Sequence, residues 1–281
     1  MLEAPTKVRQ NKTKRLMREG KTAIGTFCYF ASPWVVEMVG LAGMDFVIID
    51  LEHAAKDLQM VESMVLAAEL TGMTAIVRVP SADEKVILQV LETGAQGIMI
   101  PLVDCAETAA RAVAAAKYPP EGSRGVCRST RVAQFGLAIP KFAEFAQSAN
   151  DEMLVIALIE EKKGVENIRE IVKTGIDGVL LGPADLAASL GVMGEVGHPL
   201  VREATERVTE AVLASGTTWM GNLVFSPEGV SEWAAKGHRF FSYGIDTQIL
   251  ALAYKSIVET ARKAVNVSAA APAPKRTLSK V

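Results

Sequence analysis

Eight short apolar segments recur along the chain, and helix-like segments separate most of them. The runs lack polar alternation, which is typical of parallel strands buried on both faces. They are Thr22–Phe27, Asp45–Asp50, Thr74–Val79, Gly97–Pro101, Leu154–Ile159, Gly178–Leu181, Thr217–Val224 and Phe240–Tyr243. Strand–helix alternation over about 240 residues favours an α/β fold of the (β/α)8 TIM-barrel type. The alternative is an open doubly wound sheet, but no GxGxxG motif follows the first run and no GxxxxGK[ST] motif occurs.

The barrel is expected to occupy residues 22–265. Residues 1–21 are predicted to form an N-terminal arm with a short basic helix. The segment Ile245–Ala264 has apolar side chains spaced for one helical stripe, which predicts an extra C-terminal helix. Residues 266–281 consist mainly of Ala, Pro, Ser and Lys and are predicted to be a disordered tail, because they carry little large apolar surface to bury.

Composition excludes several classes of protein. A formal net charge of −2 does not indicate the excess of positive charge that is typical of proteins that bind nucleic acid or anionic lipid. No uncharged apolar span is long enough to cross a membrane, and no secretion signal is evident. The three cysteines are widely spaced without a CxxC pair, which argues against a disulfide framework or a structural zinc site. We therefore expect a cytoplasmic protein.

Two acidic residues follow neighbouring predicted strands. Glu160 comes directly after Leu154–Ile159, and Asp185 lies in the turn after Gly178–Leu181. Barrels bind ligands at the carboxyl ends of their strands, so both carboxylates are expected on the functional face. Two carboxylates without a nearby Cys or His suit a hard divalent cation. The alternative is that Glu160 simply starts a helix and Asp185 is a helix N-cap.

Two further candidates follow the second and third strands. His53 comes shortly after Asp50 and Glu52, and a His beside carboxylates is suited to general acid/base catalysis. The alternative is a loop His that is hydrogen-bonded for structural reasons. Arg78 lies in an otherwise apolar strand, where a guanidinium needs an acid or an anionic ligand. A structural ion pair of Arg78 with Glu92 or Asp50 is the alternative.

Six motifs, in this order, resemble the HpcH/HpaI family of metal-dependent class II pyruvate aldolases: DFVIIDLEH, AIVRVP, GAQGIMIPLV, KYPPEGSRGV, IALIE and GVLLGPADL. That family includes 4-hydroxy-2-oxo-heptanedioate and 2-dehydro-3-deoxyglucarate aldolases. The resemblance implies a TIM barrel that reversibly cleaves a 4-hydroxy-2-oxoacid to pyruvate and an aldehyde through a metal-bound pyruvate enolate. It also implies a homohexamer in which the C-terminal helix packs on a neighbouring subunit.

The resemblance also implies roles for individual residues. Glu160 and Asp185 would hold Mg, Mn or Co. The backbone N–H groups of Ala184 and Asp185 would bind the carboxylate of pyruvate at a helix start. Glu92, where some members have Asp, would support the site from behind. At the position two before the glutamate, where the family often has Gln, this chain has the apolar Leu158.

The remaining implied roles fall on the second and third strands. His53 would be the catalytic acid/base, with Asp50 as its partner in the same motif. Arg78 would bind the keto oxygen of pyruvate and of its enolate. A proton must leave the 4-hydroxyl group during cleavage, and an imidazole titrates in the range that this step needs.

Two other functions are weighed against the aldolase. A CoA-ester lyase of the citrate-lyase beta group would share the metal pair, but the sequence has no conspicuous basic groove for CoA phosphates. A non-catalytic barrel that serves as an oligomeric scaffold is disfavoured, because the chain retains the whole set of implied site residues. The aldehyde half of the substrate is not identified by the sequence.

Overall fold

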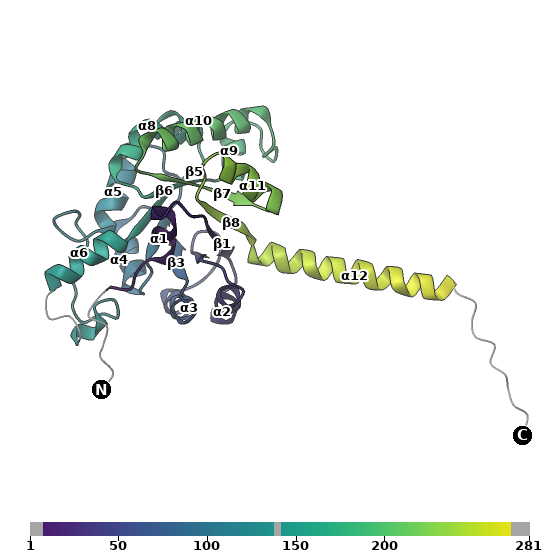
Figure 1. Ribbon diagram of the computed structural model, residues 1–281, viewed down its shortest axis with the longest axis horizontal. Coiled ribbons are helices and arrows are strands. Elements are labelled where there is room, and N and C mark those ends of the chain that lie inside the picture. Colours follow the sequence, from purple (N-terminus) through teal and green to yellow (C-terminus); the bar gives the residue numbers. More distant parts are fainter. Residues whose placement is uncertain (1–7, 138–141, 271–281) are drawn as a thin grey trace, which may run out of the picture.

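The computed structural model describes residues 8–137 and 142–270, with backbone alone from 266 onward. Eight parallel strands close into a barrel in chain order, with β8 pairing with β1 (Figure 1). The strands are β1 Ala23–Cys28, β2 Phe46–Asp50, β3 Thr74–Arg78, β4 Gly97–Ile100, β5 Leu154–Ile159, β6 Gly178–Leu181, β7 Trp219–Val224 and β8 Phe240–Ile245. The predicted TIM barrel and all eight predicted strand positions are confirmed.

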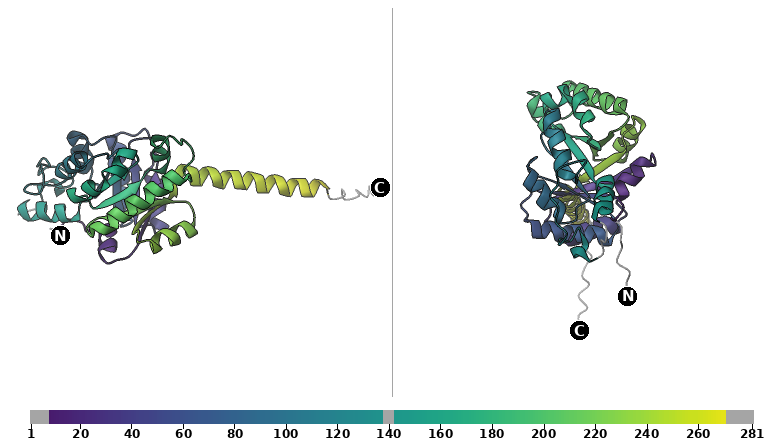
Figure 2. Two further views of the ribbon diagram at one scale, coloured as in Figure 1. Left: turned by 90° about the horizontal axis from the view of Figure 1, so that it is seen from above. Right: turned by 90° about the vertical axis from the view of Figure 1, so that its left-hand side faces the viewer.

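The described residues form helices, most of which lie around the barrel (Figures 1 and 2). They are α1 Lys12–Arg18, α2 Pro33–Leu41, α3 Leu58–Leu70, α4 Glu84–Glu92, α5 Ala106–Ala116, α6 Phe142–Glu152, α7 Lys162–Glu166, α8 Ile168–Ile171, α9 Pro183–Ser189, α10 Pro199–Ser215, α11 Pro227–Ala235 and α12 Asp246–Ala270, with 3-10 turns η1 Gln134–Gly136 and η2 Val172–Thr174. Several begin at side chains that accept backbone N–H bonds. Asp83, for example, accepts the N–H groups of Lys85 and Val86 at 2.8 and 3.0 Å.

Alternate residues of each strand face the barrel interior and the surrounding helices, which explains the continuous apolar runs. The interior is filled by a cluster that includes Phe46, Ile48, Ile76, Met99, Leu154, Ile156, Leu158, Leu180 and Phe240. On β2 the inward row Phe46, Ile48 continues to Asp50, and on β5 the same row ends at Glu160 just beyond the strand. The inward rows therefore change from apolar to charged at the carboxyl ends of the strands.

The amino-terminal end of the barrel is closed by α1. Lys14 is buried, and its Nζ lies 2.8 Å from Asp177 and donates to the carbonyl of Met153 at 2.5 Å. Burial lowers the pKa of Lys14, and the neighbouring Asp177 partly offsets that effect. Asn11 donates to the carbonyl of Gln96 at 3.1 Å. Helix α1 therefore covers the end of the barrel that lies opposite the carboxyl ends of the strands.

Helix α12 leaves the barrel from β8 and projects away from it (Figures 1 and 2). Every residue of α12 from Gln248 to Val265 is exposed. The helix runs from Asp246 to Ala270, so the predicted tail begins inside it, and residues 271–281 lie outside the described residues. No helix in the described ranges is long and apolar enough to span a membrane.

Candidate active site

A buried ion pair lies at the carboxyl ends of β2 and β3. Asp50 and Arg78 are register partners in the sheet, and both are almost fully buried. Nε of Arg78 donates to Oδ2 of Asp50 at 2.5 Å, and Nη2 contacts the same oxygen. Oδ1 of Asp50 accepts the backbone N–H groups of Glu52 and His53 at 2.9 and 2.7 Å. Asp50 therefore neutralises Arg78 and also shapes the turn that carries His53.

The remaining nitrogens of Arg78 point to two other groups. Nη1 lies 3.2 Å from Oε2 of Glu52, and Nη2 donates to the hydroxyl of Tyr29 at 2.9 Å. The guanidinium also lies 5.0 Å from the ring centroid of Phe27. Burial opposes the charge of Arg78, but Asp50, Tyr29 and Glu52 outweigh burial, so the pKa of Arg78 is raised. Arg78 is thus a permanently charged group with a fixed orientation.

His53 lies at the rim of this mouth, with its side chain 54% exposed. Its Nε2 atom is 3.5 Å from Oε2 of Glu52. Asp50 contacts the backbone N–H of His53 and not its ring. The expected partner Asp50 thus contacts His53 through the backbone, because both oxygens of Asp50 are used by Arg78 and the turn, and Glu52 faces the imidazole.

Glu160 follows β5 and is 3% exposed. Its Oε1 atom accepts the N–H of Leu102 at 2.8 Å, and Leu102 adopts a left-handed φ of 52°. Burial raises the pKa of Glu160 to about 7; the Leu102 bond lowers it, and Glu52 and Asp185 add to the rise. The charge of Arg78 lowers this pKa by less than Glu52 and Asp185 raise it, and a bound cation would add the positive charge that favours the ionised carboxylate.

Asp185 lies in the first turn of α9 and is exposed. The charge of Asp185 contributes to the raised pKa values of Glu160 and Glu52, so Asp185 lies near enough to both to repel their negative charge. An all-oxygen donor set of this kind fits a hard divalent cation such as Mg²⁺ or Mn²⁺. Within the described ranges no group of three or more His, Cys, Asp or Glu is arranged as a complete metal site. Two protein carboxylates would leave coordination positions for a chelating substrate.

Glu92 does not join this group. It is the last residue of α4, a helix that returns antiparallel to the strands and ends just before the amino-terminal end of β4. Its carboxylate pairs with Arg124 at 3.1 Å. The expectation that Glu92 supports the metal ligands from behind is therefore corrected for the chain as described, because the direction of α4 carries Glu92 to the opposite end of the barrel.

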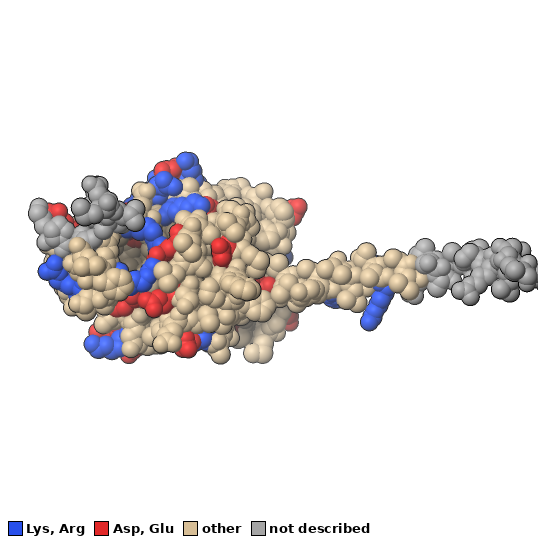
Figure 3. Space-filling model, turned by 90° about the horizontal axis from the view of Figure 1, so that it is seen from below, with Lys and Arg blue, Asp and Glu red and all other residues tan. Residues whose placement is uncertain are grey.

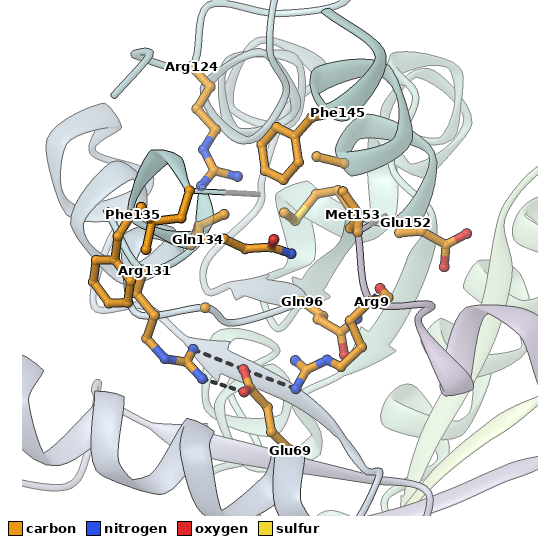
Figure 4. Close-up of a pocket in the computed structure, with 15 residues that line it drawn as sticks. Arg9, Glu69, Gln96, Arg124, Arg131, Gln134, Phe135, Phe145, Glu152 and Met153 are labelled. Atoms are coloured by element: carbon orange, nitrogen blue, oxygen red, sulfur yellow. Dashed lines mark hydrogen bonds and ion pairs between the residues drawn. The ribbon is translucent and has the colours of Figure 1, made fainter. Parts of the chain in front are cut away.

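Arg124 also lines a cavity of about 750 Å³ that lies away from the carboxylate cluster (Figure 4). Arg9 and Arg131 point at Glu69 there, with an Arg9–Glu69 distance of 2.9 Å. A hollow with basic and acidic side chains around it is also visible from below in Figure 3. The arginines of this cavity are therefore paired with carboxylates on α3 and α4. These ion pairs hold the N-terminal arm and the loop after α5 against the two helices.

Three groups at the site were not singled out from the sequence as site residues. Tyr29 directly follows β1 and Leu102 lies two residues after β4, so their positions near strand ends were the signal that the sequence offered. Glu52 was one of three polar residues after β2, and only the fold shows that it faces Arg78 and His53. Leu158 is 2% exposed in the barrel interior, so the space below Glu160 is apolar.

Comparison with known proteins gives consistent matches. The sequence model of the HpcH/HpaI aldolase/citrate lyase family matches residues 23–253. A 5-keto-4-deoxy-D-glucarate aldolase of Klebsiella pneumoniae subsp. pneumoniae is 34% identical over 254 residues, which are 90% of this chain and 97% of that protein.

Two solved structures are similar over their whole length. An HpcH/HpaI aldolase/citrate lyase family protein from Burkholderia cenocepacia J2315 superposes with a TM-score of 0.83 at 30% identity, covering 90% of this chain and 100% of that one. The citrate synthase SbnG superposes with a TM-score of 0.83 at 28% identity, covering 91% and 99%.

Proposed function

The chain belongs to the HpcH/HpaI aldolase/citrate lyase family, and on that premise we propose that it reversibly cleaves a 4-hydroxy-2-oxoacid to pyruvate and an aldehyde. It is a carbon–carbon lyase of the aldolase type. One observation carries the proposal: the buried cation Arg78 and the buried acid Glu160 lie at the same mouth of the barrel. Cleavage places negative charge on the 2-oxo oxygen, and positive charge held in a low-dielectric site stabilises it.

Glu160 and Asp185 are the proposed ligands of a divalent cation, Mg, Mn or Co. When bound, such a cation supplies Lewis acidity toward the 2-oxo acid. The protein's contribution is to hold the ligands: Leu102 fixes one oxygen of Glu160 through its N–H. The second oxygen, Oε2, stays directed toward Gly182, where the missing side chain leaves it room. No side chain at position 182 then competes for that space.

Arg78 is proposed to donate to the 2-oxo oxygen of pyruvate and of the enolate. Its charge is balanced by Asp50 and Glu52, and its orientation is set before any substrate arrives. The N–H groups of Ala184 and Asp185 open α9 and have no partner within that helix, so they are available to the substrate carboxylate. These contacts would align the bond between C3 and C4 for cleavage.

His53 is proposed to take the proton of the 4-hydroxyl group. The electrons of the O–H bond then form the aldehyde C=O, the C3–C4 bond breaks, and its electron pair moves into the enolate. Protonation of the enolate at C3 gives pyruvate. Oε2 of Glu52 lies 3.5 Å from Nε2 of the ring, so a carboxylate is next to the group that takes the proton.

The CoA-ester lyase alternative is less supported. Relatives that align over almost the whole chain are named aldolases. The arginines Arg9, Arg124 and Arg131 pair with carboxylates away from the proposed site and are not arranged to meet CoA phosphates there. Substrate choice is best surveyed with short, acidic and sugar-derived aldehydes plus pyruvate, beginning with 5-keto-4-deoxy-D-glucarate as a cleavage substrate.

We further propose that the protein is a homohexamer in which α12 packs on a neighbouring subunit. The helix exposes a row of large apolar side chains, namely Leu250, Tyr254, Ile257, Val258 and Val265. The face of α12 visible in Figure 3 is almost free of charge. Helix α2 exposes a second apolar row, with Trp34 80% and Leu41 75% exposed. Apolar surface of this extent is typical of subunit contacts.

Metal removal tests the function. EDTA is expected to abolish pyruvate formation from a 4-hydroxy-2-oxoacid, and Mg, Mn or Co is expected to restore it. Borohydride trapping checks the competing chemistry, in which a lysine forms a Schiff base with pyruvate. A pyruvate–lysine adduct together with EDTA-resistant cleavage would refute the proposal.

The unpaired state of Cys28, Cys105 and Cys127 agrees with the proposed cytoplasmic location.

A further inference from the structure

Asp246 is a buried carboxylate at the junction of β8 and α12, and the mechanism above does not use it. Its side chain is directed at the loop that follows β1. Oδ1 accepts the N–H of Tyr29 at 2.9 Å, and Oδ2 accepts the N–H of Phe30 at 3.0 Å. Oδ1 also accepts the N–H of Thr247 at 2.7 Å. Asp246 thus satisfies two backbone donors of a loop that lies more than 200 residues earlier in the chain.

The carbonyl side of the same loop is held by a second charged group. Nζ of Lys56 donates to the carbonyl of Tyr29 at 3.0 Å and to the carbonyl of Asp50 at 2.7 Å. Burial lowers the pKa of Lys56, and the neighbouring acids Asp50 and Asp246 offset part of that effect. The backbone of Tyr29 is therefore fixed from both sides, by Asp246 at its N–H and by Lys56 at its C=O.

Tyr29 carries this fixed geometry into the proposed active site. Its hydroxyl accepts from Nη2 of Arg78 at 2.9 Å, and its ring lies 6.0 Å from the guanidinium. Asp50 holds Nε and also contacts Nη2 of Arg78, and Glu52 faces Nη1, from β2 and the turn after it. Phe27 and Tyr29 approach the guanidinium from the β1 side, and of these two only Tyr29 forms a hydrogen bond with it. The position in which the loop holds Tyr29 therefore contributes to the direction of the guanidinium.

We propose that Asp246 is a positioning residue of the active site, which fixes Tyr29 and through it the orientation of Arg78. This inference rests on the proposed function, in which Arg78 binds the 2-oxo oxygen. Asp246 is also the first residue of α12, so the base of the projecting helix is joined to Arg78 through Asp246 and Tyr29. A shift of about 1 Å in a catalytic group lowers turnover by up to about 100-fold.

The test compares Asp246→Ala, Asp246→Asn and Tyr29→Phe with the double variant Asp246→Ala/Tyr29→Phe in the full-length, Mn²⁺-loaded protein. Exchange of the methyl protons of pyruvate with solvent measures enolate formation without an aldehyde. We expect Asp246→Ala to slow exchange about 10- to 100-fold. Asp246→Asn keeps one acceptor oxygen and is expected to fall between Asp246→Ala and wild type. The double variant is expected to be no slower than Asp246→Ala, because both changes act on one contact.

Two readouts and a control variant separate positioning from a general loss of structure. The Kd for Mn²⁺ is expected to stay within about twofold of wild type, since Glu160 and Asp185 are untouched. Amide hydrogen exchange is expected to rise in the peptide that contains Tyr29 and Phe30. Asp83→Ala is the matched control, because Asp83 also accepts two backbone N–H groups at a helix start, on α4. That variant is expected to exchange pyruvate protons at the wild-type rate.

Wild-type exchange rates in Asp246→Ala, or rate losses that multiply in the double variant, would overturn the positioning role. Parallel loss of Mn²⁺ affinity would also overturn it, since the effect would then be general. A wild-type protein without any metal-dependent pyruvate exchange would refute the proposed function instead. In that event the protection of the Tyr29–Phe30 amides in Asp246→Ala, compared with Asp83→Ala, still decides whether Asp246 fixes the loop.

Discussion

Gly182 lies directly against the carboxylate of Glu160. A methyl group placed on its α-carbon would sit 2.5 Å from Oε2 and 2.8 Å from Cβ of Glu160. Any side chain at this position would therefore push Glu160 out of its place at the mouth of the barrel. The glycine of the GPAD motif is required by the space that its neighbour occupies.

Gly182→Ala is accordingly expected to weaken divalent-metal binding by at least about tenfold, with a loss of stability of about 1–3 kcal/mol from overpacking. Titration with Mn²⁺ and thermal unfolding measure the two effects. Gly197→Ala is the control, because no atom lies within 4 Å of a methyl group added there. Unchanged metal affinity in Gly182→Ala would show that Glu160 does not hold the metal.

Metal affinity is expected to depend on pH through Glu160. Its pKa is raised to about 7, and a cation binds the deprotonated form, so affinity should fall about tenfold per pH unit below 7. In the absence of metal, the stability of the folded protein depends on pH with the opposite sign. The folded protein holds this proton more tightly than the unfolded chain, so stability is greatest below about pH 4.5 and declines as pH rises to about 7, by up to about 3 kcal/mol.

Calorimetric titration with Mn²⁺ at pH 5.5, 6.5 and 7.5 and unfolding of the EDTA-treated protein check the two signs. Glu160→Gln is the control. Its amide carries no titrating proton, so most of the decline in stability with rising pH should be absent from this variant. An affinity for Mn²⁺ that does not vary between pH 5.5 and 7.5 would contradict the raised pKa.

His53→Ala is expected to slow cleavage of a 4-hydroxy-2-oxoacid at least about 100-fold, because the proton of the 4-hydroxyl group loses its acceptor. Pyruvate proton exchange reports on enolate formation and should fall steeply in Arg78→Ala. Near-normal turnover in His53→Ala would refute the assignment of the acid/base.

Assembly is expected to depend on α12. A chain that ends at Thr247 keeps Asp246 but lacks the exposed apolar row of the helix, and it should dissociate or aggregate. A chain that ends at Ala270 retains the whole described helix and should keep the oligomer. Light scattering on the two proteins measures the mass of the particles. A monomeric full-length enzyme with full activity would contradict the assembly.

The eight strands and the residues at their carboxyl ends followed from the sequence alone. A parallel strand in a barrel is apolar on both faces, so Leu154–Ile159 stands out as an uninterrupted run and the acid after it is conspicuous. The same reasoning located Asp50, Arg78, Glu160 and Asp185, because a charged residue directly after or within an apolar strand has few structural uses. These are local properties, so the residue pattern of a single segment is enough to predict them.

Only the tertiary structure decided which of these residues meet. Asp50 pairs with Arg78 because β2 and β3 are in register, which leaves Glu52 to face His53. Glu92 falls at the far end because α4 runs back along the barrel. Asp246 reaches Tyr29 only because the barrel closes β8 onto β1. Contacts between distant segments depend on strand register, helix direction and barrel closure, and none of these is written in the pattern of a single segment.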